Sequence, residues 1–154
     1  MPEKHGTFVV TQVDADSAVL RDVADGQVHT MAGNPGLAVE EVLEATIATD
    51  PPMDVVWRFE SIEDRRRIEV TASDERPTKA SRDIAAGMAV GDLDRRERTD
   101  YGEIHVLTVP PGETQAAVAD IQDDLATVTR AARLGIRRVE IRAEKGIVSV
   151  RYLP

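Results

Sequence analysis

Short apolar stretches separated by turn residues fill the first part of the chain, from Thr7 to Ile62. Within each stretch apolar and polar positions alternate, which is the period of a β-strand with one buried face. The pair Asp25-Gly26 favours a tight hairpin turn, because both residues tolerate a positive φ angle. The pattern predicts five strands: Thr7–Val13, Ser17–Val23, Gln27–Met31, Val42–Ile47 and Val55–Ile62.

The connection between the third and fourth predicted strands is longer than the others and contains Gly33-Asn34-Pro35-Gly36. Five strands with one long excursion after the third are typical of an OB-type small barrel. An SH3-like barrel fits the same rhythm. The pattern therefore predicts an acidic five-stranded β-barrel domain over residues 1–62, OB-like or SH3-like.

Residues 63–101 show a weaker pattern, and we interpret them as a connecting segment. One strand is predicted over Arg67–Thr71, and the polar run ending at Pro77 is typical of a hinge or loop. A short helix is predicted from about Thr78 to Met88. The polar stretch Asp92–Tyr101 is predicted to be irregular.

The last part of the chain, residues 102–154, has the pattern of a small α+β unit. Glu103–Val109 alternates as a strand, and helical spacing covers residues 113–134 up to Gly135. Asp123-Asp124 could split this stretch, so one helix or two remain open. Two further strands form a predicted hairpin: Ile136–Ala143 and Ile147–Tyr152. The chain as a whole is thus expected to be α+β, a barrel followed by a β-α-β-β unit.

The composition indicates the kind of environment in which the protein works. Acidic residues outnumber basic ones 28 to 19, which gives a net charge of −9. Most of the basic residues are arginine, and this balance is typical of proteins that work in very salty water, where screening reduces self-repulsion. Without cysteine the chain has no disulfide, thiolate nucleophile or cysteine-ligated metal. It shows no signal-peptide pattern and no apolar run near the ~20 residues that cross a membrane, so we expect a cytoplasmic protein.

The charge is unevenly distributed along the chain. Residues 1–62 hold three basic and eleven acidic residues, a balance of −8, whereas residues 130–154 hold seven basic and two acidic residues, a balance of +5. Guanidinium groups suit phosphate because they are planar and permanently charged. Ion pairs with neighbouring carboxylates are the more common role of such arginines, and we favour that interpretation. The candidate contacts to nucleic acid or a partner are Arg130, Arg133, Arg137, Arg138, Arg142 and Arg151.

Catalytic and metal-binding patterns are not found. His5, His29 and His105 lie in separate segments without metal-ligand spacing, and His29 and His105 are interpreted as packed or edge residues. Carboxylate pairs such as Asp14/Asp16 lack the other ligands of a cation site. No catalytic residue, metal site or cofactor is therefore predicted.

The predicted barrel has few features of a nucleic-acid reader. OB-type readers combine a basic groove with aromatic stacking platforms. The second and third predicted strands contain no aromatic residue, and the barrel is strongly acidic. Trp57 and Phe59 share one face of their strand, which we interpret as part of the barrel core.

Four stretches of the sequence resemble a family of small acidic haloarchaeal proteins of unknown function: Gly6-Thr7-Phe8, Ala15–Thr30, Gly102–Val109 and Val148–Pro154. The resemblance spans most of the chain and implies a haloarchaeal source, in agreement with the composition. It implies no activity, cofactor or catalytic residue.

We therefore expect a non-enzymatic interaction module that binds another protein or a second copy of the chain, and no membrane. The alternative is an RNA- or ribosome-associated factor that uses the arginines between Arg130 and Arg151. A second alternative is an enzyme whose site is assembled from residues distant in the sequence.

Overall fold

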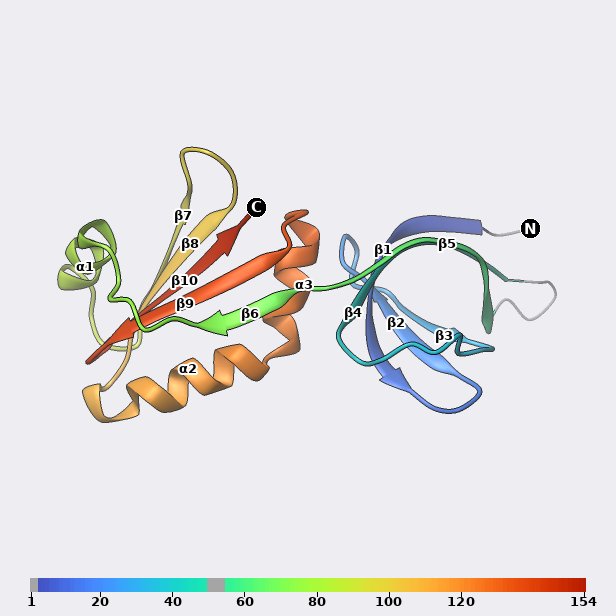
Figure 1. The fold of residues 1–154 in the computed structure, drawn as a ribbon, viewed down its shortest axis with the longest axis horizontal. Helices are drawn as coiled ribbons and strands as arrows, with labels where there is room; N and C mark the ends of the chain where they lie inside the picture. Colours follow the sequence, from blue (N-terminus) through green and yellow to red (C-terminus); the bar gives the residue numbers. More distant parts are fainter. Residues whose placement is uncertain (1–2, 50–54) are drawn as a thin grey trace. The chain divides into compact units, whose positions relative to one another are not determined.

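The computed structural model describes residues 3–49 and 55–154, which form two five-stranded sheets and three α-helices (Figure 1). The chain divides into two compact units, Met1–Ile68 with Val128–Arg133, and Glu69–Thr127 with Leu134–Pro154. The predicted α+β class is confirmed. Within the described ranges no helix is long and apolar enough to cross a membrane.

The first sheet closes on itself in the strand order β1-β2-β3-β5-β4. β1 pairs with both β2 and β4, and β3 lies parallel to β5. This order, with one parallel pair, is that of an OB-type barrel, so the topology left open by the sequence is the OB-like one. The strands are β1 (Glu3–Val13), β2 (Ala18–Asp22), β3 (Val28–Met31), β4 (Glu41–Thr49) and β5 (Trp57–Arg67).

Alternating side chains of these strands fill the barrel. The interior residues are buried and apolar because every second position of each strand points inward. Trp57, Phe59 and Ile62 of β5 are partly buried and pack against this core, as predicted for the face that Trp57 and Phe59 share. The core consists of Phe8, Val10, Ala18, Leu20, Met31, Leu37, Leu43, Ala45 and Ile47.

The second sheet has the order β6-β9-β10-β8-β7, with β6 parallel to β9 and the other neighbours antiparallel. Helix α2 lies along one face and packs against β6, β9 and β10, whereas α1 packs against β8 and β10 (Figure 1). The strands are β6 (Glu69–Ala72), β7 (Leu93–Glu97), β8 (Glu103–Thr108), β9 (Arg138–Glu144) and β10 (Ile147–Leu153). The helices are α1 (Lys79–Ala86), η1 (Pro111–Glu113), α2 (Thr114–Asp123) and α3 (Leu125–Arg133).

The helical stretch after η1 forms two helices, α2 and α3, which break at Asp124. This residue has an extended backbone conformation, and its carboxylate accepts a hydrogen bond of 2.9 Å from the backbone N–H of Ala126. An aspartate in this position favours a helix start, because it satisfies a backbone donor of the first turn. Of the two alternatives left open by the sequence, the structure therefore contains two helices, separated at Asp124.

The prediction of irregular structure over Asp92–Tyr101 was wrong, because β7 occupies Leu93–Glu97 and pairs with β8. β7 is an edge strand, and four of its five residues are charged. Charged side chains protect an exposed sheet edge, but they also remove the apolar alternation that would reveal a strand. The segment predicted as a connection thus contributes both β6 and β7 to the second sheet.

Candidate binding surfaces

Three of the predicted arginines share one face of the second sheet. Strand alternation places Arg138 and Arg142 of β9 on the face opposite the buried Val139 and Ile141. Arg151 of β10 is on the same face, since it lies directly across from Glu140. The structure therefore places Arg138, Arg142 and Arg151, three of the six candidate contacts, on one face of the second sheet.

Carboxylates neutralise much of this arginine face. Oε1 of Glu140 accepts hydrogen bonds from Nε of Arg142 at 2.7 Å and from Nη1 of Arg151 at 2.6 Å. Nη2 of Arg142 also lies 2.6 Å from Glu75. Arg76 donates to Glu144 at 3.0 Å. The face is therefore a network of ion pairs rather than a free cationic surface.

The ionisation of the glutamates reflects this network. Burial opposes the charged form of Glu140, but the hydrogen bonds from Arg151 and Arg142 outweigh it and lower the pKa of Glu140. The pKa of Glu144 is also lowered, mainly by the hydrogen bond from Arg76, and the charge of Arg82 acts in the same direction. Both carboxylates are therefore ionised partners of arginine near neutral pH.

The other predicted arginines do not join a single surface. Nε of Arg138 lies 3.4 Å from the carbonyl oxygen of Pro154, and Nε of Arg133 donates to the carbonyl oxygen of Val23 at 2.9 Å. Arg130 and Arg137 also take part in interactions within the protein. Arg130 and Arg133 belong to α3 rather than to the sheet.

The barrel carries an open groove where β3 ends and β5 continues. β3 pairs with β5 only through Met31 and Trp57, after which the chain leaves the sheet in a loop. The space between that loop and β5 is a groove of about 500 Å³. Its lining is mostly apolar: Ala32, Gly33, Asn34, Pro35, Arg58, Phe59 and Ile62.

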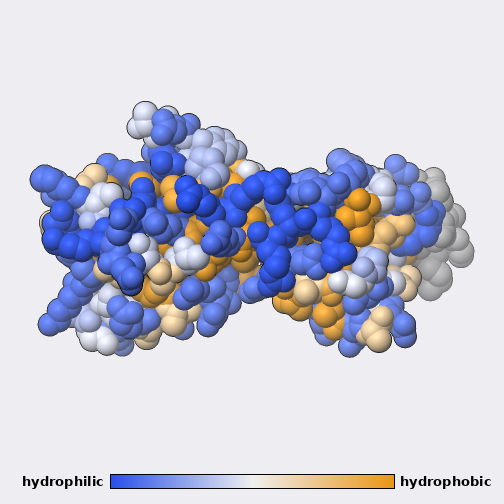
Figure 2. Space-filling model, viewed as in Figure 1, coloured by the Kyte–Doolittle hydropathy of each residue, from blue (hydrophilic) through white to orange (hydrophobic). Residues whose placement is uncertain are grey.

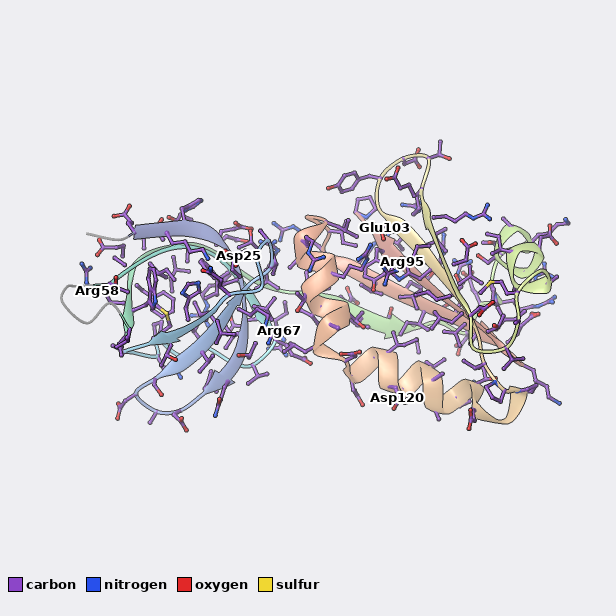
Figure 3. All side chains as sticks on the ribbon, turned by 180° about the vertical axis from the view of Figure 1, so that it is seen from behind. Asp25, Arg58, Arg67, Arg95, Glu103 and Asp120 are labelled. Atoms are coloured by element: carbon purple, nitrogen blue, oxygen red, sulfur yellow. The ribbon has the colours of Figure 1, made fainter. Side chains whose placement is uncertain are left out.

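Figure 2 shows apolar residues interrupting the hydrophilic surface of the barrel, and Figure 3 places Arg58 at its rim on β5. Arg58 forms an ion pair with Glu60. Phe59 and Ile62 both pack against the barrel core and line the groove, a dual role that alternation alone could not reveal.

A polar cluster lies between the start of β1 and the β2–β3 turn. Nζ of Lys4 lies 3.0 Å from Asp22, 2.8 Å from Asp25 and 3.1 Å from Nε2 of His29. Burial disfavours the Lys4 ammonium, but hydrogen bonds to Asp25 and Asp22 outweigh this and raise its pKa. His29 is buried and contacts Phe8 and Trp57 edge-on, and burial followed by the charge of Lys4 lowers its pKa.

The remaining candidate chemistry is structural in character. His105 is buried as predicted, and its Nε2 lies 2.9 Å from Glu103 while its ring contacts Tyr152. Figure 3 labels Glu103 together with Arg95 on the β7–β8 hairpin. Among the residues described by the structure, no three His, Asp or Glu side chains converge as a metal site.

Sequence reasoning missed the groove and two polar residues of the second unit, Arg82 and Ser149. The groove forms because β3 pairs with β5 only at Met31 and Trp57. The turn residues Gly33-Asn34-Pro35-Gly36, which end β3, were the one sequence signal of this early end. Ser149 looked like an ordinary outward position of β10, but it is only 1% exposed.

In the comparison with protein families, the model of a family of unknown function (DUF5812) matches residues 4–143. The chain belongs to this family. The DUF5812 match includes the barrel except for the first residue of β1, and it continues through nearly all of β9. The expected resemblance to a family of unknown function is confirmed. No match was found among curated proteins or solved structures.

Proposed function

We propose that this DUF5812 protein is a non-enzymatic binding module whose barrel receives an extended segment of a partner protein in the groove beside β5. The groove between residues 32–35 and β5 carries this proposal, because it exposes apolar core residues at the surface of a charged barrel. A mostly apolar groove in a charged surface is suited to bind an apolar group of another molecule. Phe59 and Ile62 would contact one large apolar side chain of the partner.

The backbone of β5 supports an extended ligand. β5 pairs with β4 along its length, but beyond Trp57 no strand among the residues described by the structure pairs with its other side. An open strand edge can accept a further strand through main-chain hydrogen bonds, while neighbouring pockets select side chains. The groove lies along Arg58, Phe59 and Ile62 of this edge.

Charge indicates the character of the partner. Residues 1–68 contain six basic and thirteen acidic residues, a balance of −7. Complementary charge speeds encounter and disfavours like-charged partners. The partner segment would therefore carry basic residues beside its apolar anchor.

The same balance disfavours RNA as the occupant of the groove, because phosphate contacts require a basic surface. The alternative of RNA binding by the sheet arginines stays a prediction, and the pairing of Arg142 and Arg151 with Glu140 does not favour it.

Selection from a phage-displayed library of short random peptides tests this proposal. The library is selected in parallel on the wild type and on Ile62→Lys, which places a charge in the groove floor. Val90→Lys in the second unit is the control, since Val90 is an exposed apolar residue far from the groove in sequence. We expect peptides with one large apolar residue and basic neighbours on the wild type and on Val90→Lys, and their loss on Ile62→Lys.

Binding of the recovered peptides can be followed by the fluorescence of Trp57, the single tryptophan of the chain. Backbone N-methylation of a recovered peptide should abolish binding, because strand addition needs its N–H groups. Selections that return the same peptides on the wild type and Ile62→Lys would refute the proposal. Single-stranded RNA that binds the wild type and fails to bind Ile62→Lys would also refute it.

A further inference from the structure

Three buried donors of the second unit have no hydrogen-bond partner within the described part of the chain. They are the hydroxyl of Ser149, Nε of Arg151 and Nε of Arg82. Ser149 is 1% exposed, so its hydroxyl is enclosed by protein. Buried polar groups almost always have hydrogen-bond partners, because an unpaired one has lost its contacts with water and gained nothing in exchange. A cluster of such donors therefore indicates a ligand that offers acceptors.

The three donors come from adjacent elements on one side of the sheet. Ser149 and Arg151 are two residues apart on β10 and share a face, across from Arg142 and Glu140 of β9. Arg82 belongs to α1, which packs against β8 and β10. Thr108 donates to the backbone of Ala89 just after α1, and Thr108 points to the same side as Ser149.

The existing ion pairs leave these donors unsatisfied. Oε1 of Glu140 already accepts from Arg142 and from Nη1 of Arg151. Nε of the Arg82 guanidinium has no hydrogen-bond partner within the described part of the chain, although the charge of Arg82 acts on Glu144. Four arginines against three glutamates give this region a local balance of +1 in a chain of −9. The groups counted are Arg76, Arg82, Arg142, Arg151, Glu75, Glu140 and Glu144.

We propose that Arg82, Ser149 and Arg151 bind a phosphate group between α1 and β10. Guanidinium N–H groups and a serine hydroxyl match the several acceptor oxygens of a tetrahedral oxyanion. Because the donors are buried, salt screens this contact much less than it screens a surface ion pair.

A neighbouring cavity provides room for a larger ligand. Arg151 and Ile104, which lie opposite each other, line a cavity of about 340 Å³ together with Arg98 and Thr99. Glu97 and Asp100 also line it, and their carboxylates can accept hydrogen bonds from hydroxyl groups. The phosphate is thus either free or carried by a small hydroxylated molecule.

Titration calorimetry with inorganic phosphate and with ribose phosphate, at constant ionic strength in KCl, tests the site. Arg82→Gln should weaken binding by roughly tenfold or more, because it removes charge-assisted hydrogen bonds. Ser149→Ala should weaken binding several-fold. Without ligand it should not lower the free energy of unfolding, since the lost hydroxyl has no protein acceptor. Lys79→Gln is the control on the same helix, with a side chain that is 82% exposed.

The two ligands distinguish the source of the phosphate. Equal affinities would assign a free phosphate, and tighter binding of ribose phosphate would assign a phosphorylated small molecule that extends into the cavity. Arg82→Lys keeps the positive charge but lacks the planar guanidinium group. This variant should bind phosphate more weakly than the wild type and more tightly than Arg82→Gln. Failure of both ligands to bind the folded wild type, or binding unaffected by Arg82→Gln, would overturn the proposal.

Discussion

Lys4 illustrates how a single side chain can organise one part of the barrel. It is one of three lysines in the chain, and it joins the first residues of β1 to the turn that follows β2. Its ammonium is a donor only, so Nε2 of the adjacent His29 must accept, which fixes the neutral form of the ring. A protonated His29 would place two positive groups 3.1 Å apart.

This contact predicts a loss of stability at mildly acidic pH. Above the unfolded-state pKa of about 6.5, His29 is neutral in the folded and the unfolded state, so it does not change the free energy of unfolding with pH. Below it, the unfolded chain takes up a proton that folded His29 resists, because its folded pKa is lowered by burial and by Lys4. Between about pH 7.5 and pH 5.5, urea unfolding should show a drop in stability that is smaller in His29→Gln by about 1 kcal/mol.

His5→Gln is the matched control, because the His5 side chain is 65% exposed. It should keep the full drop of the wild type. An identical pH dependence in the wild type and His29→Gln would show that the Lys4–His29 contact does not resist protonation.

The β7–β8 hairpin shows how one backbone position can hold an element in place. Gly102 begins the return into β8 with a φ angle of 97°, a conformation that favours glycine. Its carbonyl accepts from the backbone N–H of Arg98 at 3.0 Å. A Cβ atom at this position would overlap the carbonyl oxygen of Tyr152 at the end of β10. The hairpin can therefore approach β10 only because residue 102 has no side chain.

Gly102→Ala should consequently destabilise the second unit by about 3 kcal/mol or more, since a positive φ angle and a steric overlap add. Gly112→Ala is the control, because a Cβ there meets no atom within 4 Å and φ is not positive. Thermal unfolding followed by circular dichroism measures both. Equal midpoints for the two variants would contradict the close approach of Gly102 to Tyr152.

Charge is distributed between the two units of the whole molecule in an uneven way. The barrel segment, residues 1–68, carries −7 of the net −9. Several of its cationic groups are paired with carboxylates, as in the bidentate contact of Arg65 with Glu41 and the contact of Arg66 with Glu44. The remaining carboxylates repel one another, and only dissolved cations can offset this.

We therefore expect the thermal midpoint to rise by several degrees as KCl increases from about 0.1 M to about 1 M, where the screening length falls from about 10 Å to about 3 Å. The double variant Asp14→Asn with Asp16→Asn removes two exposed barrel charges and should show a smaller rise. A midpoint that stays constant or falls with KCl would rule out self-repulsion as the dominant salt effect.

The sequence predicted the barrel because its strands have one face inside and one outside, a pattern that alternation records directly. β7 was not predicted because it is an edge strand, Leu93–Glu97, whose charged residues protect the sheet edge and leave no apolar alternation to detect. The groove was not predicted because it depends on where β3 ends relative to β5, and the sequence pattern does not show how two strands far apart in the chain are aligned. The sequence marked Arg142 and Arg151 only as candidate contacts, and the structure is needed to show that both share Glu140.

Because β6 pairs in parallel with β9, the partner strand of β6 is made only late in the synthesis of the chain on the ribosome. The five barrel strands emerge first and can close without later residues, whereas β6 must wait for Arg138–Ile141 before its N–H and C=O groups find a neighbour. At usual translation rates that interval is on the order of ten seconds. A nascent chain thus exposes the unpaired strand Glu69–Ala72, whose short length and acidic first residue limit pairing with other nascent chains.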